Sequence, residues 1–531
     1  MTDAPFFSLI VPVYNSDLRF LQEAIDSVRM QSFRYWELIL IDDKSPNSEI
    51  VPFLRTQAEL DERIVVVEQA ENGGISVASN AGLAVARGEF IGLLDHDDLL
   101  GAGALRTAAE ALTADPQIDY LYTDEDKVDE LGEFSEAFFK PDWSPERLRN
   151  QMYTSHFSVY RRALVEQVGG FRSEFDGSQD HDLALRVTEL ARHVHHVPEV
   201  LYHWRILPES TASSGDAKPY AWDAGVRAVD EHVKRTGTGD GAVRGPWQGT
   251  VEVTRTLGKG HRISVVIPTR GGTGTVNGVE RCFVVDAVRG LLEQTVAGRL
   301  EIVIVYDTAT PEGVLAELRR IGGDSLVLVE FADEFNFSAK CNLGAVHSTG
   351  DILVMLNDDV EPISRSALED LCAPLEQQDV GLTGGYLVFE DGHIQHAGHQ
   401  YAHRGYGHPY QDYSLDDPGP FCALDVDREV SGVTAACAAL RRTVFFEIGG
   451  FSEELPINFN DVDFSLKVRQ AGYRILWISR ARLYHFESRT REARVEQFEV
   501  DRIRARWGVP GNDPFVHLRT RTMMRRERAG L

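Results

Sequence analysis

The amino-acid sequence contains one ordered set of polar and small residues twice, once in each half. Asn80 and Asn342 are 262 positions apart (342 − 80), and Asp97 and Asp359 are separated by the same interval (359 − 97). The recurring positions are Pro12, Asp43, Asn80, Asp97, Gly-Gly-Phe at 169–171, Asp180 and His203, and then Pro268, Asp307, Asn342, Asp359, Gly-Gly-Phe at 449–451, Asp461 and His485. Because solenoid repeats are only about 20–50 residues long, this period indicates two whole domains.

Size and charge narrow the class of protein. A chain of 531 residues can form two or three domains, each with its own full core. The net charge of −28 argues against a nucleic-acid partner bound through its phosphates. A phosphorylated small ligand would need a metal cation to enter so acidic a protein. The five cysteines are an odd set without paired short spacings, which argues against a disulfide framework or a zinc site and fits a reducing cytoplasm.

The sequence shows no membrane-spanning pattern. No run approaches the roughly 18 consecutive apolar residues of a membrane helix, and the N-terminus lacks a basic region before its apolar stretch. We therefore expect a soluble or peripheral protein. The last segment, 519–531, contains five arginines and one acid. We expect a solvated tail there; the alternative is docking of this tail on anionic lipid.

Each half begins with alternating strands and helices. Apolar strands are predicted at 7–15 and 37–43 in the first half and at 263–271 and 301–307 in the second, with later strands at 90–98 and 352–360. Continuous apolar strands that alternate with amphipathic helices predict an α/β fold with a mostly parallel sheet covered on both faces. In such sheets ligands bind at the carboxyl ends of strands, where Asp43, Asp307 and the later acidic clusters are expected.

The predicted domain boundaries follow from glycine and proline content. We assign residues 1–236 to a first domain and 263–500 to a second. The junction, 237–262, is rich in glycine and includes a predicted strand at 250–257. Residues 501–531 are predicted to form a charged, helical, arginine-rich tail.

An acidic cluster follows a buried strand in each half. Asp95, Asp97 and Asp98 are hard oxygen ligands that can hold Mg²⁺ or Mn²⁺, and such ions complete their shell with substrate phosphates. The alternative is a helix N-cap, which aspartate favours. The cluster recurs as Asn357-Asp358-Asp359, so Asp97 and Asp359 are the shared carboxylates.

Further along, an aspartate and a histidine recur in the same order. Asp180 and Asp461 begin predicted helices, and a carboxylate near an acceptor hydroxyl can act as a general base. An N-cap is again the alternative. His203 and His485 follow, and neutral imidazoles can complete a metal shell, whereas a lone histidine is more often a packed or surface residue.

This ordered set resembles the family 2 glycosyltransferases, which are inverting enzymes of the GT-A fold, over nearly the whole chain and in both halves. The segments YTDEDKVDELGEF and HFESRTR look like bacterial polysaccharide and O-antigen synthases, including rhamnosyl- and galactofuranosyltransferases. The resemblance implies two GT-A domains in tandem, Mg²⁺ or Mn²⁺ as cofactor, a nucleotide-sugar donor such as dTDP-rhamnose or a UDP-sugar, and a lipid-linked or oligosaccharide acceptor. It implies a cytoplasmic protein, or one at the inner face of the cell membrane.

The same resemblance implies a role for each recurring residue. Asp180 and Asp461 would be the general bases, and Asp43 and Asp307 would contact the nucleobase. The metal ligands would be Asp97, His203, Asp359 and His485. The rest of the nucleotide-sugar pocket would comprise Pro12, Asn80, Asp95, Pro268, Asn342, Asn357 and Asp358.

The sequence departs from the family pattern near the donor site. The family often has an arginine before the motif asparagine, whereas Ser79 and Cys341 stand here, so a diphosphate contact at that position is not implied. The second half also retains only one acid, Asp307, of the usual pair. Lys340 is a candidate to supply the positive charge of the arginine that is absent before the motif asparagine, but we expect it to be an ordinary exposed lysine.

A histidine-rich stretch marks the second half. It contains His393, His396, His399, His403 and His408. A metal site is one interpretation, but the stretch lacks the cysteines and the helical pairing of a structural zinc site. We expect an acceptor-binding loop that offers aromatic and imidazole faces to sugars.

Several functions are compatible with these patterns. The favoured one is a bifunctional glycosyltransferase whose two domains carry out separate transfers. The alternatives are one catalytic domain with a degenerate copy that holds the glycan, and a non-catalytic carbohydrate-binding or scaffolding protein. Strand-end acids also occur in nucleotidyltransferases, but the order Gly-Gly-Phe, aspartate, histidine does not suggest that class.

Overall fold

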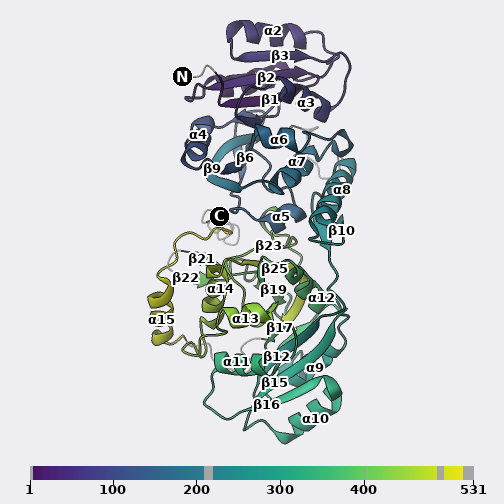
Figure 1. Ribbon diagram of the computed structural model, residues 1–531, viewed down its shortest axis with the longest axis vertical. Helices are drawn as coiled ribbons and strands as arrows, with labels where there is room; N and C mark the ends of the chain where they lie inside the picture. The colour runs from purple at the N-terminus through teal and green to yellow at the C-terminus, as the bar shows by residue number, and fades with distance from the viewer. Residues whose placement is uncertain (1–3, 208–218, 403–404, 487–494, 518–531) are drawn as a thin grey trace. The chain divides into compact units, whose positions relative to one another are not determined.

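The computed structural model describes residues 4–207, 219–402, 405–486 and 495–517 (Figure 1). The chain divides into two compact units, one formed by Met1–Gly237 with Gly241–Val253 and the other by Thr238–Asp240 with Thr254–Leu531. Each unit contains one large mixed sheet with helices packed on it, so the α/β prediction is confirmed. No helix within the described residues is both long and apolar enough to span a bilayer.

The first unit is built on a nine-stranded sheet with the order β3-β2-β1-β4-β8-β6-β9-β5, to which β7 is added beside β6. Strands β1 to β4 run parallel, and β8 is antiparallel to β4 and β6. The strands are β1 (Phe7–Val13), β2 (Trp36–Asp42), β3 (Ile64–Glu68), β4 (Phe90–Leu93), β5 (Leu99–Leu100), β6 (Ile118–Val128), β7 (Phe134–Phe138), β8 (Ser158–Arg161) and β9 (His193–Arg205). The helices are α1 (Leu18–Arg29), α2 (Ile50–Leu60), α3 (Ile75–Val85), α4 (Ala104–Ala114), α5 (Pro145–Asn150), α6 (Arg162–Gln167), α7 (Gln179–Thr188) and α8 (Pro219–Thr236).

The second unit repeats this strand order as β16-β15-β12-β17-β24-β19-β25-β18, with β20 beside β19 and β23 beside β25. Its main strands are β12 (Arg262–Thr269), β15 (Arg299–Asp307), β16 (Leu326–Phe331), β17 (Ile352–Leu356), β18 (Val360–Pro362), β19 (Val380–Val388), β20 (Ile394–His396), β23 (Arg428–Glu429), β24 (Cys437–Arg441) and β25 (Arg474–His485). The helices are α9 (Phe283–Leu292), α10 (Glu312–Gly322), α11 (Phe337–His347), α12 (Ala367–Cys372), α13 (Arg442–Glu447), α14 (Asn460–Gln470) and α15 (Gln497–Trp507).

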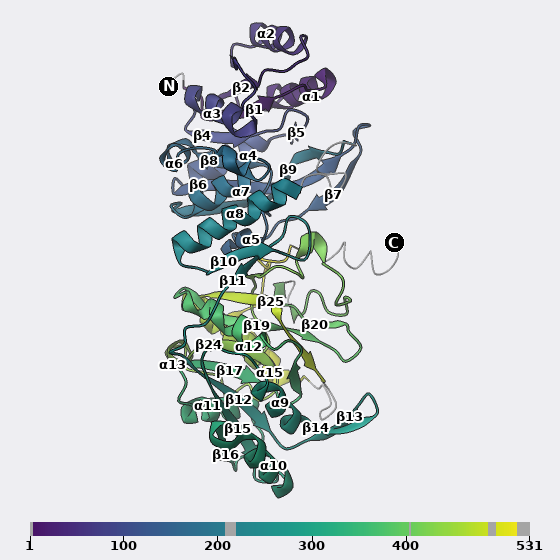
Figure 2. The same cartoon turned by 90° about the vertical axis from the view of Figure 1, so that its right-hand side faces the viewer.

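Two hairpins complete the second unit. They are β13 (Thr273–Val276) with β14 (Val279–Cys282), and β21 (Gln400–Ala402) with β22 (Gly405–Gly407). Figure 2 shows the first of them standing out from the unit beside α9. No disulfide links the five cysteines, all of which belong to the described residues.

The apolar cores explain why the predicted strands read as continuous hydrophobic runs. Every residue of β2 is buried, because helices cover both faces of the sheet. On one face β1 and β2 contribute Leu9 and Leu38 to a large cluster, and on the other they contribute Ile10 and Ile39 to a smaller one. In each unit the parallel strands end at one edge of the sheet. The polar residues after β1 and β4 lie at this edge in the first unit, and those after β12 and β17 lie at it in the second.

The expected junction at 237–262 contains folded structure. Strands β10 (Gly241–Arg244) and β11 (Val251–Thr254) form an antiparallel hairpin that groups with the first unit. Gly245, Pro246 and Gly249, which contributed to the predicted break, lie in its turn, in which Gly245 N donates to Thr250 O at 3.0 Å. The indole Nε1 of Trp222 donates to Thr250 O at 2.7 Å and ties α8 to the hairpin.

The C-terminal helix belongs to the second unit. α15 begins before the predicted boundary at residue 500, and Ile503, which is buried, packs against Leu455 and Val462. The arginines at 519–528 lie outside the described residues.

Candidate active sites

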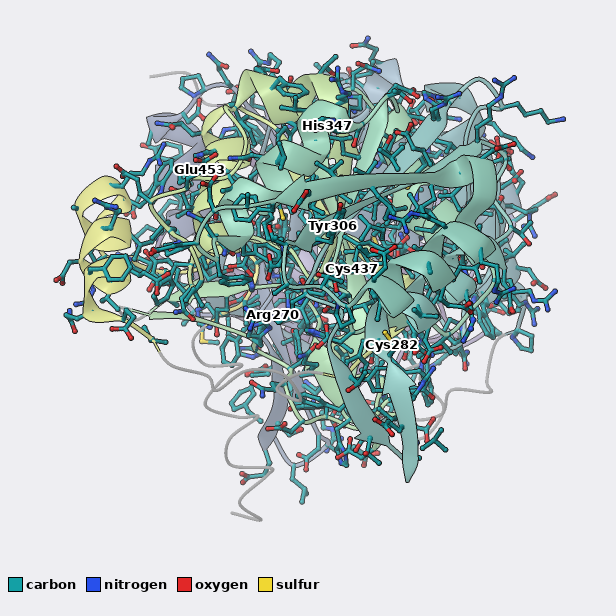
Figure 3. The ribbon with its side chains drawn as sticks, turned by 90° about the horizontal axis from the view of Figure 1, so that it is seen from below. Arg270, Cys282, Tyr306, His347, Cys437 and Glu453 are labelled. Atoms are coloured by element: carbon teal, nitrogen blue, oxygen red, sulfur yellow. The ribbon has the colours of Figure 1, made fainter. Side chains whose placement is uncertain are left out.

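Each unit has a cavity at the carboxyl ends of its parallel strands. The cavity of the first unit has a volume of about 540 Å³, and the cavity of the second about 450 Å³. In the first, the lining includes Pro12, Asp95 and Asp180. In the second, it includes Pro268, Asn357, Asp358, Asp359, Asp461 and His485. Figure 3 labels Arg270 and Tyr306, which lie at the ends of the neighbouring strands β12 and β15 at this edge.

Strand pairing positions the metal-ligand candidates of the second unit. β18 pairs antiparallel with β25 so that Val360 is opposite His485, which brings the imidazole next to the preceding Asp359. His485 Nε2 lies 3.2 Å from Asp359 Oδ1 and 3.3 Å from Asn357 Nδ2. Both His485 and Asp359 are buried. A carboxylate, an imidazole nitrogen and a neighbouring amide form a donor set that suits Mg²⁺ or Mn²⁺.

The charges in this cavity favour a cation. Burial, reinforced by the negative charge of Asp359, raises the pKa of Asp358 to about 6. The hydroxyl of Thr269 donates to Asp358 Oδ2 at 2.6 Å, which opposes that shift without cancelling it. Two adjacent carboxylates at a buried strand end repel one another, and a bound divalent ion would relieve that repulsion.

Asp461 stands in the first turn of α14 and faces the same cavity. The N-cap of this helix is Phe459, and the N-cap of α7 is Ser178, so neither Asp461 nor Asp180 is the capping residue. The backbone N–H of Val462 donates to Asp461 Oδ1 at 2.8 Å. Burial raises the pKa of Asp461, which brings its carboxylate nearer to the basicity that a general base needs.

The acidic clusters do not cap helices either. In the first unit the next helix, α4, begins at Ala104 with Gly103 as its N-cap. The N-cap alternative for Asp95, Asp97 and Asp98 is therefore wrong.

The strand-end acids predicted to contact the nucleobase have different partners in the two units. Asp43 accepts hydrogen bonds from the backbone N–H of Gly73 at 2.8 Å and of Gly74 at 2.9 Å, and from Asn72 Nδ2 at 3.0 Å. Asp307 instead faces Lys340, whose Nζ lies 2.7 Å from Asp307 Oδ1.

The expectation that Lys340 is exposed is wrong. Its side chain is only 1% exposed, and it also donates to the carbonyl of Thr269 at 2.7 Å. Lys340 lines the cavity of the second unit. Burial lowers the pKa of Lys340, while the Asp307 carboxylate opposes that shift.

The motif asparagines hold the Gly-Gly-Phe turns. Asn80 Nδ2 donates to Phe171 O at 2.8 Å, and Phe171 N donates to Asn80 Oδ1 at 2.9 Å. Asn342 forms the same pair of hydrogen bonds: its Nδ2 donates to Phe451 O at 3.0 Å, and Phe451 N donates to its Oδ1 at 2.9 Å. A Cβ at Gly170 would lie 2.5 Å from Asn80 Oδ1, so the second glycine is required by this close approach. The contact of Asn80 and Asn342 with a nucleotide sugar stays a prediction.

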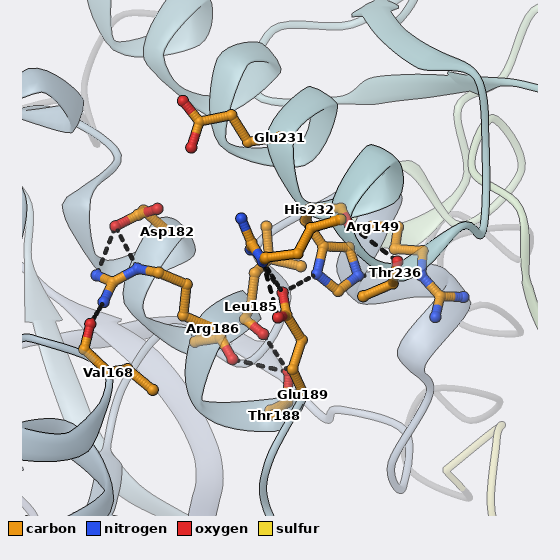
Figure 4. Close-up of polar contacts among 12 residues, drawn as sticks. Arg149, Val168, Asp182, Leu185, Arg186, Thr188, Glu189, Glu231, His232 and Thr236 are labelled. Atoms are coloured by element: carbon orange, nitrogen blue, oxygen red, sulfur yellow. Dashed lines mark hydrogen bonds and ion pairs between the residues drawn. The ribbon is translucent and has the colours of Figure 1, made fainter.

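A second aspartate takes part in linking the helix of each predicted base to its Gly-Gly-Phe turn. Asp182, two residues after Asp180, accepts from Arg186 Nη2 at 2.6 Å, and Arg186 also donates to Val168 O at 2.8 Å (Figure 4). In the second unit, Lys467 takes the place of this arginine and donates to Gly450 O at 2.8 Å. The second aspartate therefore has a structural role, and the first one faces the cavity.

The first unit departs from the predicted metal site. Asp97 and His203 are not among the residues that line its cavity. His203 Nδ1 lies 2.5 Å from Asp126 Oδ1, and its ring packs against Phe134 with the ring centroids 4.6 Å apart. The assignment of Asp97 and His203 as metal ligands stays a prediction.

His156, which sequence reasoning missed, joins the acids of the first unit. Three possible ligand atoms lie within 4.8 Å of one another, one each from Asp95, Asp98 and His156. Burial raises the pKa of Asp95, and burial raises that of Asp98 further. The repeat conceals His156 because the matching strand in the second unit, β24, is preceded by Ala436.

The histidine-rich stretch forms hydrogen bonds beside the second cavity. Ring nitrogens of His396, His399 and His408 lie within 4.8 Å of one another, which fits a metal site by distance. However, the backbone N–H of Thr434 donates to His396 Nε2 at 3.3 Å. The proton of neutral His396 is then on Nδ1, which donates to His408 Nδ1 at 2.8 Å. His408 lines the cavity, and the interpretation of this stretch as an acceptor-binding loop stays a prediction. His403 lies outside the described residues.

Comparison with known sequences identifies a family. The signature described as "Glycosyl transferase family 2" matches this chain twice, over residues 8–169 and 264–449. One match falls in each unit, and together they cover more than half of the chain.

Two curated relatives are similar over nearly the whole chain. "Uncharacterized protein y4gI" of Sinorhizobium fredii is 40% identical over 522 residues, which is 96% of this chain and 56% of that protein. "O-antigen biosynthesis protein RfbC" of Myxococcus xanthus is 36% identical over 493 residues, which is 92% of this chain and 38% of that protein. The chain thus spans about half, or less, of the length of these relatives.

More distant similarity is found among solved structures. TarS of S. aureus is 22% identical with a TM-score of 0.34 over 43% of this chain and 39% of that chain. Mannosyltransferase PcManGT from Pyrobaculum calidifontis, in complex with GDP-Man and Mn²⁺, is 20% identical with a TM-score of 0.33 over 44% of this chain and 64% of that chain.

The order of motifs predicted a family 2 resemblance in both halves, and the double match of the family signature confirms it. The identical strand order of the two sheets agrees with a tandem arrangement of one fold. The chain belongs to glycosyl transferase family 2, with one GT-A-type domain in each unit.

Proposed function

We propose that this protein is a metal-dependent, inverting glycosyltransferase that builds a bacterial surface polysaccharide from nucleotide-diphosphate sugars. The observation that carries the proposal is the placement of Asp359, His485 and Asp461 around one cavity of the second unit. The name of the Myxococcus relative, an O-antigen biosynthesis protein, supports a polysaccharide as the product. The proposed donor is dTDP-rhamnose or a UDP-sugar, and the proposed acceptor is a lipid-linked or free oligosaccharide.

The residues of the second unit divide the chemistry among them. A bound Mg²⁺ or Mn²⁺ supplies positive charge to the diphosphate leaving group, and Asp359 and His485 are the residues that would hold the ion. Asp461 accepts the proton of the acceptor hydroxyl on its carboxylate. The hydroxyl oxygen attacks the anomeric carbon, and the nucleoside diphosphate leaves with the electron pair of the broken bond. Inversion follows because this is a single displacement from the opposite face.

Bifunctionality is the finer part of the proposal. The first unit has its own cavity, lined by Asp180, Asp95 and His156, and Asp98 lies close to the last two, so we propose a separate transfer there. One observation favours the alternative of a single catalytic unit beside a glycan-holding copy: Asp97 and His203 do not line the first cavity. We place the reaction in the cytoplasm or at the inner face of the cell membrane.

A screen of nucleotide sugars tests the proposal. The full chain is incubated with dTDP-, UDP- and GDP-sugars, with and without Mn²⁺, and both thermal stability and nucleoside diphosphate release are measured. A donor that binds the native state raises the unfolding temperature. We expect one class of donor to stabilise the protein and to be turned over only with the metal. If no donor shifts the unfolding temperature or releases nucleoside diphosphate, the proposal is wrong.

A further inference from the structure

The imidazole of His485 has a hydrogen-bond partner on the side of the ring away from Asp359, and the repeated motif does not contain this partner. His485 Nδ1 lies 2.6 Å from Gln395 Oε1, while its Nε2 is the nitrogen that faces Asp359 and Asn357. The amide oxygen of Gln395 can only accept a hydrogen bond, so Nδ1 must donate. The proton of neutral His485 is therefore on Nδ1, and its lone pair is on Nε2, towards the proposed metal site.

The position of Gln395 is itself fixed. Gln395 is buried and lies in the middle of β20. The backbone of its neighbour Ile394 donates to Tyr413 O at 2.7 Å and accepts from Asp412 N at 2.8 Å. On the other side, β20 pairs with β19. A strand that is held along both edges leaves its side chain little freedom, so Gln395 can hold the imidazole in one orientation.

The first unit shows the same contact with a different partner. His203, the counterpart of His485, also uses Nδ1, which lies 2.5 Å from Asp126 Oδ1. Asp126 is on β6, beside β9. The partner thus comes from a different strand in each unit, although the same ring nitrogen is engaged. Two unrelated side chains that fix the same tautomer indicate that the tautomer matters and not the packing of one particular residue.

We propose that Gln395 is the positioning residue that fixes the tautomer of His485 and orients its Nε2 towards the metal of the second unit. The inference rests on the proposed function of the second site. A ligand histidine usually donates its other ring N–H to a carboxylate or carbonyl, and loss of that partner typically costs about 10–100-fold in metal affinity. Because a carboxylate makes the imidazole a stronger ligand than an amide does, Gln395→Glu retains metal binding or tightens it.

Two variants of one residue, compared with controls, test this in the full chain. Mn²⁺ binding is measured by calorimetry in wild type, Gln395→Leu, Gln395→Glu and the exposed-site control Gln378→Leu. His485→Ala identifies which binding event belongs to the second unit. We expect that event to weaken about 10–100-fold in Gln395→Leu and to be at least as strong as in wild type in Gln395→Glu and Gln378→Leu. If Gln395→Leu leaves the event unchanged, the inference is wrong while the metal site stands.

A second readout does not depend on the metal. Histidine-selective ¹⁵N NMR of the metal-free chain reports the tautomer of each ring, and the signal missing from His485→Ala assigns His485 among the 17 histidines. We expect the Nδ1–H form in wild type and Gln395→Glu, and a mixture of both tautomers in Gln395→Leu. An Nε2–H form in wild type overturns the inference whatever the metal data show. A third outcome is the expected Nδ1–H tautomer in wild type, with Mn²⁺ binding that is the same in wild type and His485→Ala. That outcome overturns the metal site of the proposed function, and with it the role of Gln395.

Discussion

The ammonium of Lys340 lies 2.7 Å from Oδ1 of Asp307, and this ion pair distinguishes the second unit from the first. In the first unit the matching acid, Asp43, is held by backbone N–H groups of Gly73 and Gly74 and by an asparagine. One fold therefore satisfies the same strand-end carboxylate in two ways. In the second unit it places a buried cation at the edge of the cavity.

Removal of this cation should destabilise the second unit. Lys340→Met leaves the Asp307 carboxylate and the Thr269 carbonyl without their charged donor, and a hydrogen bond to a charged group contributes about 1.5–3 kcal/mol. We expect a loss of this size in the free energy of unfolding by urea. Lys259→Met, at an exposed lysine, is the control and should change little. Equal stability of Lys340→Met and Lys259→Met would show that the pair contributes nothing.

The two proposed bases should act on separate steps. From Asp97 to Gly169 is 72 positions (169 − 97), and from Asp359 to Gly449 is 90 (449 − 359), so the second unit has a longer acceptor-side segment. In the structure this segment contains the hairpin of β21 and β22, which has no counterpart among the described strands of the first unit. The two cavities should therefore accept different acceptors.

Asp180→Asn and Asp461→Asn test this separation. Each variant keeps the size of the side chain and removes the proton acceptor, so each should slow a different transfer by about 10²–10⁴. Product analysis with a defined acceptor measures both steps, and Asp391→Asn, at an exposed position, is the control. A variant that forms wild-type products at the wild-type rate identifies its unit as non-catalytic.

Chelation should abolish transfer. The proposed ligands Asp359 and His485, whose Oδ1 and Nε2 atoms lie 3.2 Å apart, belong to a cavity in which the ammonium of Lys340 is already paired with Asp307. Removal of a divalent ion therefore takes away the charge that the proposed mechanism places on the diphosphate. We expect no activity in excess EDTA and recovery with Mg²⁺ or Mn²⁺. Full activity of metal-free enzyme in EDTA would exclude a metal role.

The pH dependence of the second transfer should reflect the burial of Asp461. Burial raises its pKa above the ordinary value of 3.8, so the carboxylate takes up a proton at a higher pH than a free aspartate does. A general base is active only when ionised. We therefore expect kcat/KM, measured in Asp180→Asn, to fall on the acid side at a pH above 3.8. An acid limb at the ordinary aspartate value would argue against this role.

Acid should weaken the first unit through Glu189, at the end of α7 (Figure 4). Burial opposes its ionisation, but hydrogen bonds from Arg235 and His232 outweigh burial and lower its pKa from 4.5 to about 2. A depressed pKa stabilises the fold above the unfolded value of 4.5, and that stability is lost as the pH falls towards 2.

Glu189→Gln measures this contribution. Partial exposure screens the charges, so we expect a cost of about 1–2 kcal/mol at pH 7 that shrinks below pH 4. Urea unfolding at both pH values gives the difference. A cost that is the same at pH 7 and pH 3 would assign the effect to packing instead of charge.

The sequence alone predicted the α/β class, the two-fold repeat and the family. The prediction of the fold class succeeded because the spacing of apolar residues follows the geometry of strands and helices. The repeat and the family could be recognised because the order of the motifs is kept although the sequence between the motifs has diverged. The sequence also named Asp359, Asp461 and His485, which the structure brings to one cavity. They meet because parallel strands end at the same edge and because β25 returns antiparallel to β18.

Only the tertiary structure decided which side chains pair with these residues. The register of β18 against β25, the burial of Lys340 beside Asp307 and the approach of Gln395 to His485 all join positions that are distant along the chain. Nothing in the local pattern encodes such contacts, since they depend on how strands align and on a few tenths of an ångström in side-chain position. His156 was missed for the same reason: it reaches Asp95 and Asp98 in one copy of the fold, and the comparison of the two halves could reveal only what both copies share.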